Sequence, residues 1–144
     1  MLAELRDARA LAEQAAKTLR REELEIEELR SSSLAAIQEV KRRSPSSLQN
    51  AQALEDAVNR LVSPKYLSLA ASLRECAQLA ENLEPIIEQA DSDHSESGVV
   101  EAARHLREFA RNFASLRQLA QAAAKNNEEA LDCLRQIRAV VALM

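Results

Sequence analysis

Residues 99–144 decide the fold of this chain, and they read VVEAARHLREFARNFASLRQLAQAAAKNNEEALDCLRQIRAVVALM. Apolar side chains recur there at alternating steps of three and four, and Asn127 interrupts the series. These heptad positions are Val99, Ala102, Leu106, Phe109, Phe113, Leu116, Ala120, Ala123, Ala130, Leu134, Ile137, Val141 and Met144. Because such spacing averages about 3.5 residues, it draws a nearly straight line along a helix that faces another helix. The pattern predicts a long packing helix over about 98–143.

A similar spacing covers the first segment of the chain. Its heptad positions are Leu5, Ala8, Ala12, Ala15, Leu19, Glu22, Ile26, Leu29, Ser33, Ala36 and Val40. The segment ends in Lys41-Arg42-Arg43, where positive charge favours the carboxyl end of a helix. We expect a helix over about 2–43, followed by a serine-rich turn at 44–47.

The second segment, about 47–90, has two apolar faces whose registers differ. One face runs from Ala51 to Leu61, and the next begins at Tyr66. Ser63-Pro64 lies between them, and serine suits a helix cap while proline suits the first helical turn. We therefore predict a helix broken at 62–64, with a further kink near Pro85 and a polar loop over 91–97.

Composition points to the same class. The chain of 144 residues has 27 alanines and 21 leucines but one tyrosine and two phenylalanines. Alanine and leucine favour helices, and strand formers are scarce. The predicted fold class is all-α: one domain spanning 1–144, built as an elongated antiparallel three-helix bundle or coiled coil, with the order up-down-up. One architectural alternative is open, in which the first helix pairs with its copy in a homodimer.

Polar residues at heptad positions suggest how the helices are aligned. Folding the chain at turns near 46 and 94 places Ser33 level with Asn59, and Asn127 level with about residue 62. We expect Ser33, Asn59 and Asn127 to form a polar layer that specifies register, as one buried asparagine does in coiled coils.

Charge and hydropathy exclude several classes of partner. The formal net charge is −4 and the isoelectric point about 5.3, which argues against nucleic acid or anionic lipid as a partner. No run of 18 apolar residues exists, so we expect no membrane span. The two cysteines are too few for a disulfide framework, and the first residues do not resemble a signal peptide. For these two reasons we expect a cytoplasmic protein.

Catalytic and metal-binding patterns are weak. His94 lies in the predicted acidic loop, whose residues lack the spacing of a calcium site. The sequence contains no Cys-x-x-Cys pair of the kind that binds zinc. We therefore expect no cofactor, no metal and no enzyme activity. His105 is a helical histidine of the kind found in phosphotransfer proteins, but Arg107 and Glu108 replace the lysine and glycine expected after it. Glu22 is the one charged heptad residue, and we expect it to reach solvent.

Charged side chains offer a candidate docking surface instead. Arg104, Arg107 and Arg111 lie along one side of the predicted third helix, with Arg117 beyond them. They suit an acidic partner, such as another coiled-coil subunit. The serines of 31–33, 44–47 and 92–97 are open to phosphorylation.

Two stretches resemble the small helical shoulder subunit of dynactin. They are Leu54-Glu55-Asp56 with Leu61-Val62-Ser63-Pro64-Lys65-Tyr66-Leu67, and Leu83-Glu84-Pro85 with Asp91-Ser92 and Ala102-Ala103-Arg104-His105-Leu106. The resemblance leaves the first helix uncovered and requires a deletion between its two pieces. It implies a non-catalytic scaffold subunit of a microtubule-motor cofactor.

The function predicted from these features is a non-enzymatic helical scaffold or adaptor for protein–protein assembly in a larger cytoskeletal, trafficking or chromosome-segregation complex. Two alternatives are open. One is a secreted bacterial effector-like helical adaptor, and the other is a phosphotransfer protein that uses His105.

Overall fold

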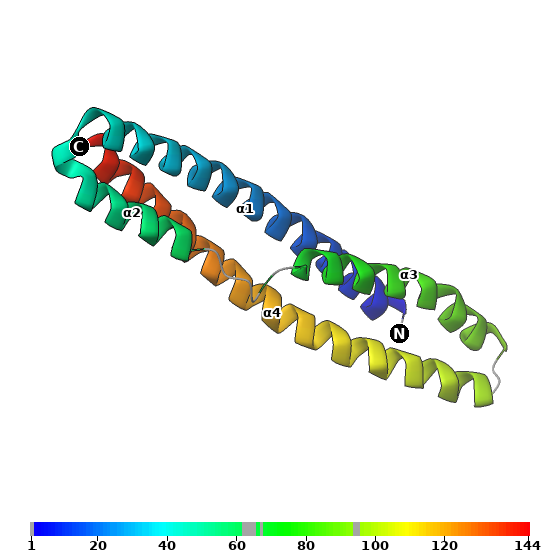
Figure 1. The fold of residues 1–144 in the computed structure, drawn as a ribbon. Helices are drawn as coiled ribbons and strands as arrows, with labels where there is room; N and C mark the ends of the chain where they lie inside the picture. Colours follow the sequence, from blue (N-terminus) through cyan, green and yellow to red (C-terminus); the bar gives the residue numbers. More distant parts are fainter. Residues whose placement is uncertain (1, 62–65, 67, 94–95) are drawn as a thin grey trace. The chain divides into compact units, whose positions relative to one another are not determined.

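The chain is almost entirely helical in the part that the structure, a computed structural model, describes: residues 2–61, 66, 68–93 and 96–144. The helices are α1 (Leu2–Arg43), the short 3-10 helix η1 (Pro45–Ser47), α2 (Leu48–Arg60), α3 (Leu69–Asp93) and α4 (Glu96–Ala142) (Figure 1). These described residues contain no strand. The all-α prediction is confirmed.

The longest helices begin and end close to the residues that the apolar spacing predicts. α1 covers Leu2–Arg43, as predicted. The predicted second segment corresponds to two helices, α2 and α3. The predicted break at 62–64, with Ser63 and Pro64, lies outside the described residues. Pro85 lies inside α3, which continues to Asp93.

The predicted loop at 91–97 is wrong at both ends. Asp91–Asp93 form the last turn of α3, and Glu96–Gly98 form the first turn of α4. Glu96 places a carboxylate in that first turn, where negative charge stabilises a helix. The polarity of these residues marks exposure to solvent rather than loss of helix. His94 lies outside the described residues.

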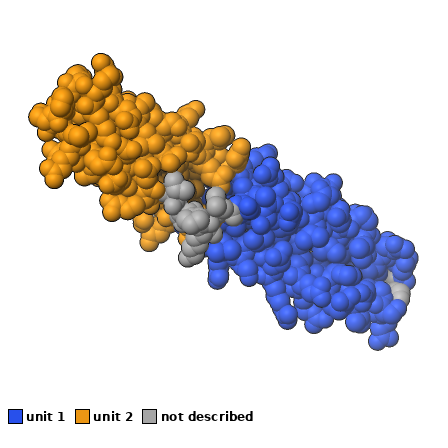
Figure 2. All heavy atoms as spheres, viewed as in Figure 1, with its two compact units in different colours: residues 1–19, 68–122 blue, residues 20–67, 123–144 orange. Residues whose placement is uncertain are grey.

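The chain divides into two compact units, which Figure 2 colours separately. The first unit comprises residues 1–19 and 68–122, and the second comprises residues 20–67 and 123–144. Each unit therefore combines a part of α1, a part of α4 and one further helix, which is α3 in the first unit and α2 in the second.

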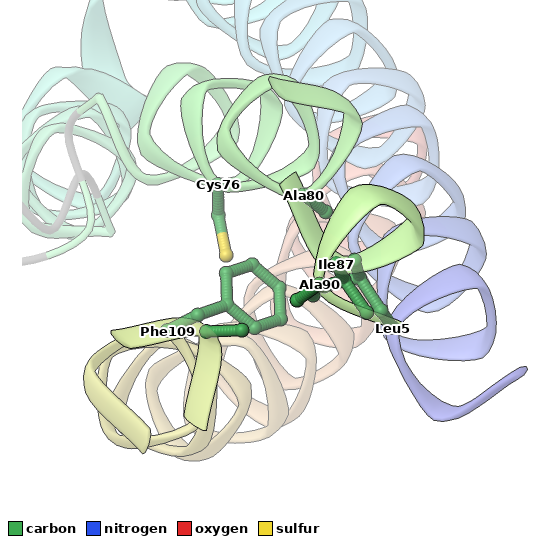
Figure 3. Packing of buried hydrophobic residues seen from close by; sticks show 7 residues of the cluster. Leu5, Cys76, Ala80, Ile87, Ala90 and Phe109 are labelled. Carbon is green, nitrogen blue, oxygen red and sulfur yellow. The ribbon is translucent and has the colours of Figure 1, made fainter. Parts of the chain in front are cut away.

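In the first unit, the core is built from leucine, isoleucine and small side chains around one phenylalanine. Its buried members are Leu5, Cys76, Ala80, Ile87, Ala90, Ala102 and Phe109. Figure 3 shows Cys76 of α3 pointing toward the ring of Phe109 in α4. Phe109 also stacks on Phe113, with ring centroids 6.1 Å apart. Ion pairs from Arg6 to Glu84 (2.6 Å) and from Arg9 to Glu81 (3.4 Å) show that α1 and α3 run antiparallel here.

The second unit has its own apolar core. Its buried members are Ile37, Val40, Ala51, Val58, Leu134, Ile137 and Val141. Lys41 Nζ donates to Gln52 Oε1 at 2.7 Å, and Arg30 Nη2 donates to Asn59 Oδ1 at 3.5 Å, so α1 and α2 run antiparallel. α4 runs parallel to α1 within this unit, as the contacts of Asn127 and Arg138 with α1 show below.

Several heptad positions are displaced from the predicted line. Val99 is 41% exposed, and Ala16 and Ile37 are buried where the pattern favoured their neighbours Ala15 and Ala36. Leu5, Ala12, Leu19, Ser33 and Val40 stay buried on the predicted line, so the strict seven-residue repeat persists along α1 and only the positions between them move by one residue.

Candidate docking surface

The segment of α4 in the first unit carries basic side chains on the face opposite its core. Arg104, Arg107 and Arg111 are spaced by three and four residues, and all are exposed. Ala102 and Phe109, on the same segment, are buried in the core. At about 100° per residue, Arg107 and Phe109 lie roughly 160° apart around the helix axis. We call Arg104, Arg107 and Arg111 the basic stripe.

Arg104 is already paired within its own helix. It contacts Glu101 one turn earlier and Glu108 one turn later, the latter at 3.3 Å. The hydrogen bond from Arg104 lowers the pKa of Glu101, and the same bond raises the pKa of Arg104. Much of the Arg104 charge is therefore compensated by these two carboxylates.

Arg107 and Arg111 differ from Arg104. Neither side chain forms an ion pair or a hydrogen bond with any residue of the described ranges, and both are exposed. Two uncompensated guanidinium groups thus stand one turn apart on a regular helix. A guanidinium presents several donors in a plane that matches a carboxylate, so an acidic side chain is its natural partner.

Arg117 does not belong to the same face. It follows Arg111 by six residues, which rotates it by about 120° around α4. It is exposed, and no ion pair joins it to the described part of the chain. The structure therefore brings together three of the four arginines that the sequence suggested and separates the fourth.

The three residues proposed as a polar layer have different surroundings in the second unit. Ser33 is fully buried, and its hydroxyl has no hydrogen-bond partner among the described residues. Asn59 accepts from Arg30, one turn before Ser33. Asn127 donates instead to Glu22, which lies eleven positions before Ser33 along α1. The structure does not bring Asn127 together with Ser33.

The contact between Asn127 and Glu22 is a polar pairing that sequence reasoning missed. Asn127 Nδ2 donates to Glu22 Oε2 at 2.9 Å, and both residues are half-buried. Glu22 is not fully buried, so part of its side chain reaches solvent as expected, and Asn127 of α4 covers another part of it. A signal was present in the sequence, because Glu22 and Asn127 are the strongly polar residues that interrupt the two longest heptad patterns.

Contacts of α4 with α1 continue toward the carboxyl end of the second unit. Arg135 Nη2 lies 3.2 Å from Glu25 Oε1, and Arg138 Nη1 donates to the carbonyl of Ser32 at 3.5 Å. These pairs advance in the same direction along both helices. They establish the parallel arrangement of α1 and α4 within this unit.

His105 lies beside an acidic residue of its own helix. Its Nε2 lies 3.4 Å from Glu101 Oε1, one turn earlier, and the side chain is one-third exposed. No group of three or more histidine, cysteine, aspartate or glutamate residues suited to a metal ion occurs within the described residues. Burial raises the pKa of the Cys76 thiol, which makes it a poor nucleophile.

None of the described helices is both long enough and apolar enough to span a bilayer. Comparison of the chain with protein-family models, with curated proteins and with solved structures finds no significant match.

Proposed function

We propose that this protein is a non-enzymatic helical module that docks an acidic protein partner on the basic stripe and so serves as a scaffold or adaptor. The observation that carries the proposal is the pair Arg107 and Arg111. Both side chains are exposed, and no residue in the described ranges compensates their charge. The helix beneath them is held by the buried side chains of Ala102 and Phe109.

The partner that fits this stripe is an acidic helix, such as one from another coiled-coil subunit. A helix repeats its side chains every three and four residues, and so matches the spacing of the stripe. Exposed charge pairs contribute mainly to the rate and specificity of association, so binding should weaken at high salt. Cytoskeletal, trafficking and chromosome-segregation complexes contain such subunits, and the resemblance to the dynactin shoulder subunit fits this class.

For the architecture we propose the elongated up-down-up three-helix bundle that the sequence predicts. In its favour, α1 and α4 each contribute residues to both units. The helix directions found separately in each unit agree with this topology. Small-angle X-ray scattering tests it, since a single rod of three helices gives a strongly asymmetric distance distribution and a globular particle does not.

Affinity purification from the native cell, followed by mass spectrometry, tests the docking function. The double variant Arg107→Glu/Arg111→Glu should lose the partners that the parent chain retains. Lys17→Glu/Arg21→Glu is the matched control, because it makes the same change in net charge at two exposed, unpaired residues of α1. If the two double variants lose the same partners, binding depends on overall charge and the stripe has no special role.

A further inference from the structure

The turn between α1 and α2 combines a basic run with a cluster of serines. Lys41-Arg42-Arg43 ends α1, and Ser44-Pro45-Ser46-Ser47 follows before α2 begins at Leu48. We propose that Ser46 is a phosphorylation site for a protein kinase that selects an arginine three residues before the acceptor serine. This inference is independent of the docking function proposed above.

An arginine three residues before a serine occurs three times in the chain, and the serines differ in their exposure. Arg30–Ser33, Arg43–Ser46 and Arg60–Ser63 share this spacing. Ser33 is fully buried inside α1, so its hydroxyl is not accessible to a kinase. Ser46 is exposed in the short helix η1. Ser63 lies outside the described residues, and the experiment below removes it.

The surroundings of Ser46 leave its hydroxyl accessible. Its Oγ lies 3.4 Å from Ser44 Oγ, which in turn lies 3.2 Å from Ser47 Oγ. The helix η1 contains no buried residue. Two backbone hydrogen bonds close this turn: Ser47 N donates to the carbonyl of Ser44 at 3.0 Å, and Leu48 N donates to the carbonyl of Pro45. Local opening of the turn inside a kinase groove would therefore uncover none of the core.

The basic residues before Ser46 are not equally available. Lys41 contacts Gln52 and Glu55, and Arg42 contacts Glu39. Arg43 is exposed and has no ion pair with the residues that the structure describes. Acidic side chains in a kinase groove select substrates by pairing with such an arginine. The residue three positions before Ser46 is thus exposed and forms no ion pair within the described residues, and its charge acts on the nearby Glu39 only through space, where it helps to lower the pKa of that carboxyl.

A phosphate on Ser46 would also suit the folded turn. It would sit immediately before α2, whose N-cap residue Ser47 makes no side-chain capping hydrogen bond. A phosphate dianion is favourable at a helix N-terminus and near an unpaired arginine. Phosphorylation of Ser46 therefore adds negative charge to the surface without destabilising α2.

The reaction requires a nucleoside triphosphate as phosphoryl donor. The Ser46 Oγ attacks the γ-phosphorus, an O–P bond forms, and the bond from that phosphorus to the β-phosphate oxygen breaks. The hydroxyl proton passes to the catalytic base of the kinase, and the nucleoside diphosphate leaves. No electrons are exchanged.

The test uses the full chain carrying Ser63→Ala, incubated with a purified arginine-directed kinase and labelled ATP. We expect label on Ser46, identified by tandem mass spectrometry. Adding Ser46→Ala should reduce incorporation at least about tenfold, and Arg43→Gln should reduce its rate by a similar factor. Adding Ser33→Ala should leave incorporation unchanged.

A synthetic peptide covering residues 39–49 is labelled in parallel. If the peptide accepts phosphate and the folded chain does not, the argument from accessibility is overturned. If neither accepts phosphate, the argument from the basic motif is overturned. Equal labelling of the chains with and without Ser46→Ala would also reject the proposal.

Discussion

Asn127 of α4 donates a hydrogen bond of 2.9 Å to Glu22 of α1, so the turns of the two helices that carry these residues face each other in the second unit. Each side chain is a strongly polar residue at a heptad position, so the two polar positions pair with each other. Hydrogen bonds to charged groups contribute about 1.5–3 kcal/mol when buried, and half-burial reduces that figure.

A double-mutant cycle measures this pair directly. We expect Glu22→Ala, Asn127→Ala and the double variant to reveal a coupling energy of about 1 kcal/mol in chemical denaturation. The cycle cancels the gain in helix propensity that each alanine brings. A coupling energy of zero within error would show that the contact does not align the helices.

Ser33→Ala should stabilise the protein. The Ser33 hydroxyl is fully buried without a hydrogen-bond partner in the described part of the chain. Removing an unsatisfied buried hydroxyl recovers about 1 kcal/mol, which raises the melting temperature by about 2–4 °C in a protein of this size.

Ser32→Ala is the matched control for that measurement. Ser32 directly precedes Ser33 and is exposed. Its substitution by alanine changes the helix propensity by the same amount. The stabilisation by Ser33→Ala must exceed that of Ser32→Ala. Equal shifts would mean that helix propensity alone accounts for the gain and that the buried hydroxyl costs nothing.

Acid should weaken the ion pair of Glu101 with Arg104. The pKa of Glu101 is lowered in the folded chain, chiefly by the hydrogen bond from Arg104. A lowered folded-state pKa contributes stability that is present above the ordinary value of 4.5 and is lost as the pH falls through the folded-state pKa. Thermal melts of the parent and of Glu101→Gln should therefore differ at pH 7 and converge toward pH 3.

Glu75→Gln serves as the comparison in the same titration. Glu75 is an exposed glutamate inside α3, away from the helix ends, and no ion pair joins it to the rest of the described chain. The difference in melting temperature between parent and Glu101→Gln should change with pH more than the difference for Glu75→Gln. If the two differences follow the same pH profile, the pair with Arg104 contributes nothing specific.

The helices could be predicted from the sequence because their apolar spacing is dense and regular. The range of α1 follows from alanine and leucine repeated over eleven turns, and its basic last turn marks where it ends. The loop at 91–97 was wrong because acidic and serine residues are as compatible with an exposed helix end as with a loop. Asp93 and Glu96 show this at the two helix ends.

The pairing of side chains between helices was less predictable. Folding the chain at two turns placed Asn127 level with about residue 62 and in one layer with Ser33, whereas Asn127 contacts Glu22. The alignment of α4 with α1 depends on the conformation of both connections. Heptad spacing carries no information about those conformations. The basic stripe was partly predictable, since Arg104, Arg107 and Arg111 follow helical spacing, whereas Arg117 lies outside it by the same geometry.

Two adjacent isoleucines in α3 provide the clearest test of the core of the first unit. Ile87 is fully buried, and Ile86 is 45% exposed. Ile87→Ala removes buried methyl groups and leaves a cavity between α1, α3 and α4, which costs about 2–5 kcal/mol. Ile86→Ala makes the same chemical change at the same level of the helix and should cost less than about 1 kcal/mol. Urea denaturation followed by circular dichroism measures both. If the two variants are destabilised equally, the face of α3 that packs in the first unit is not the one described here.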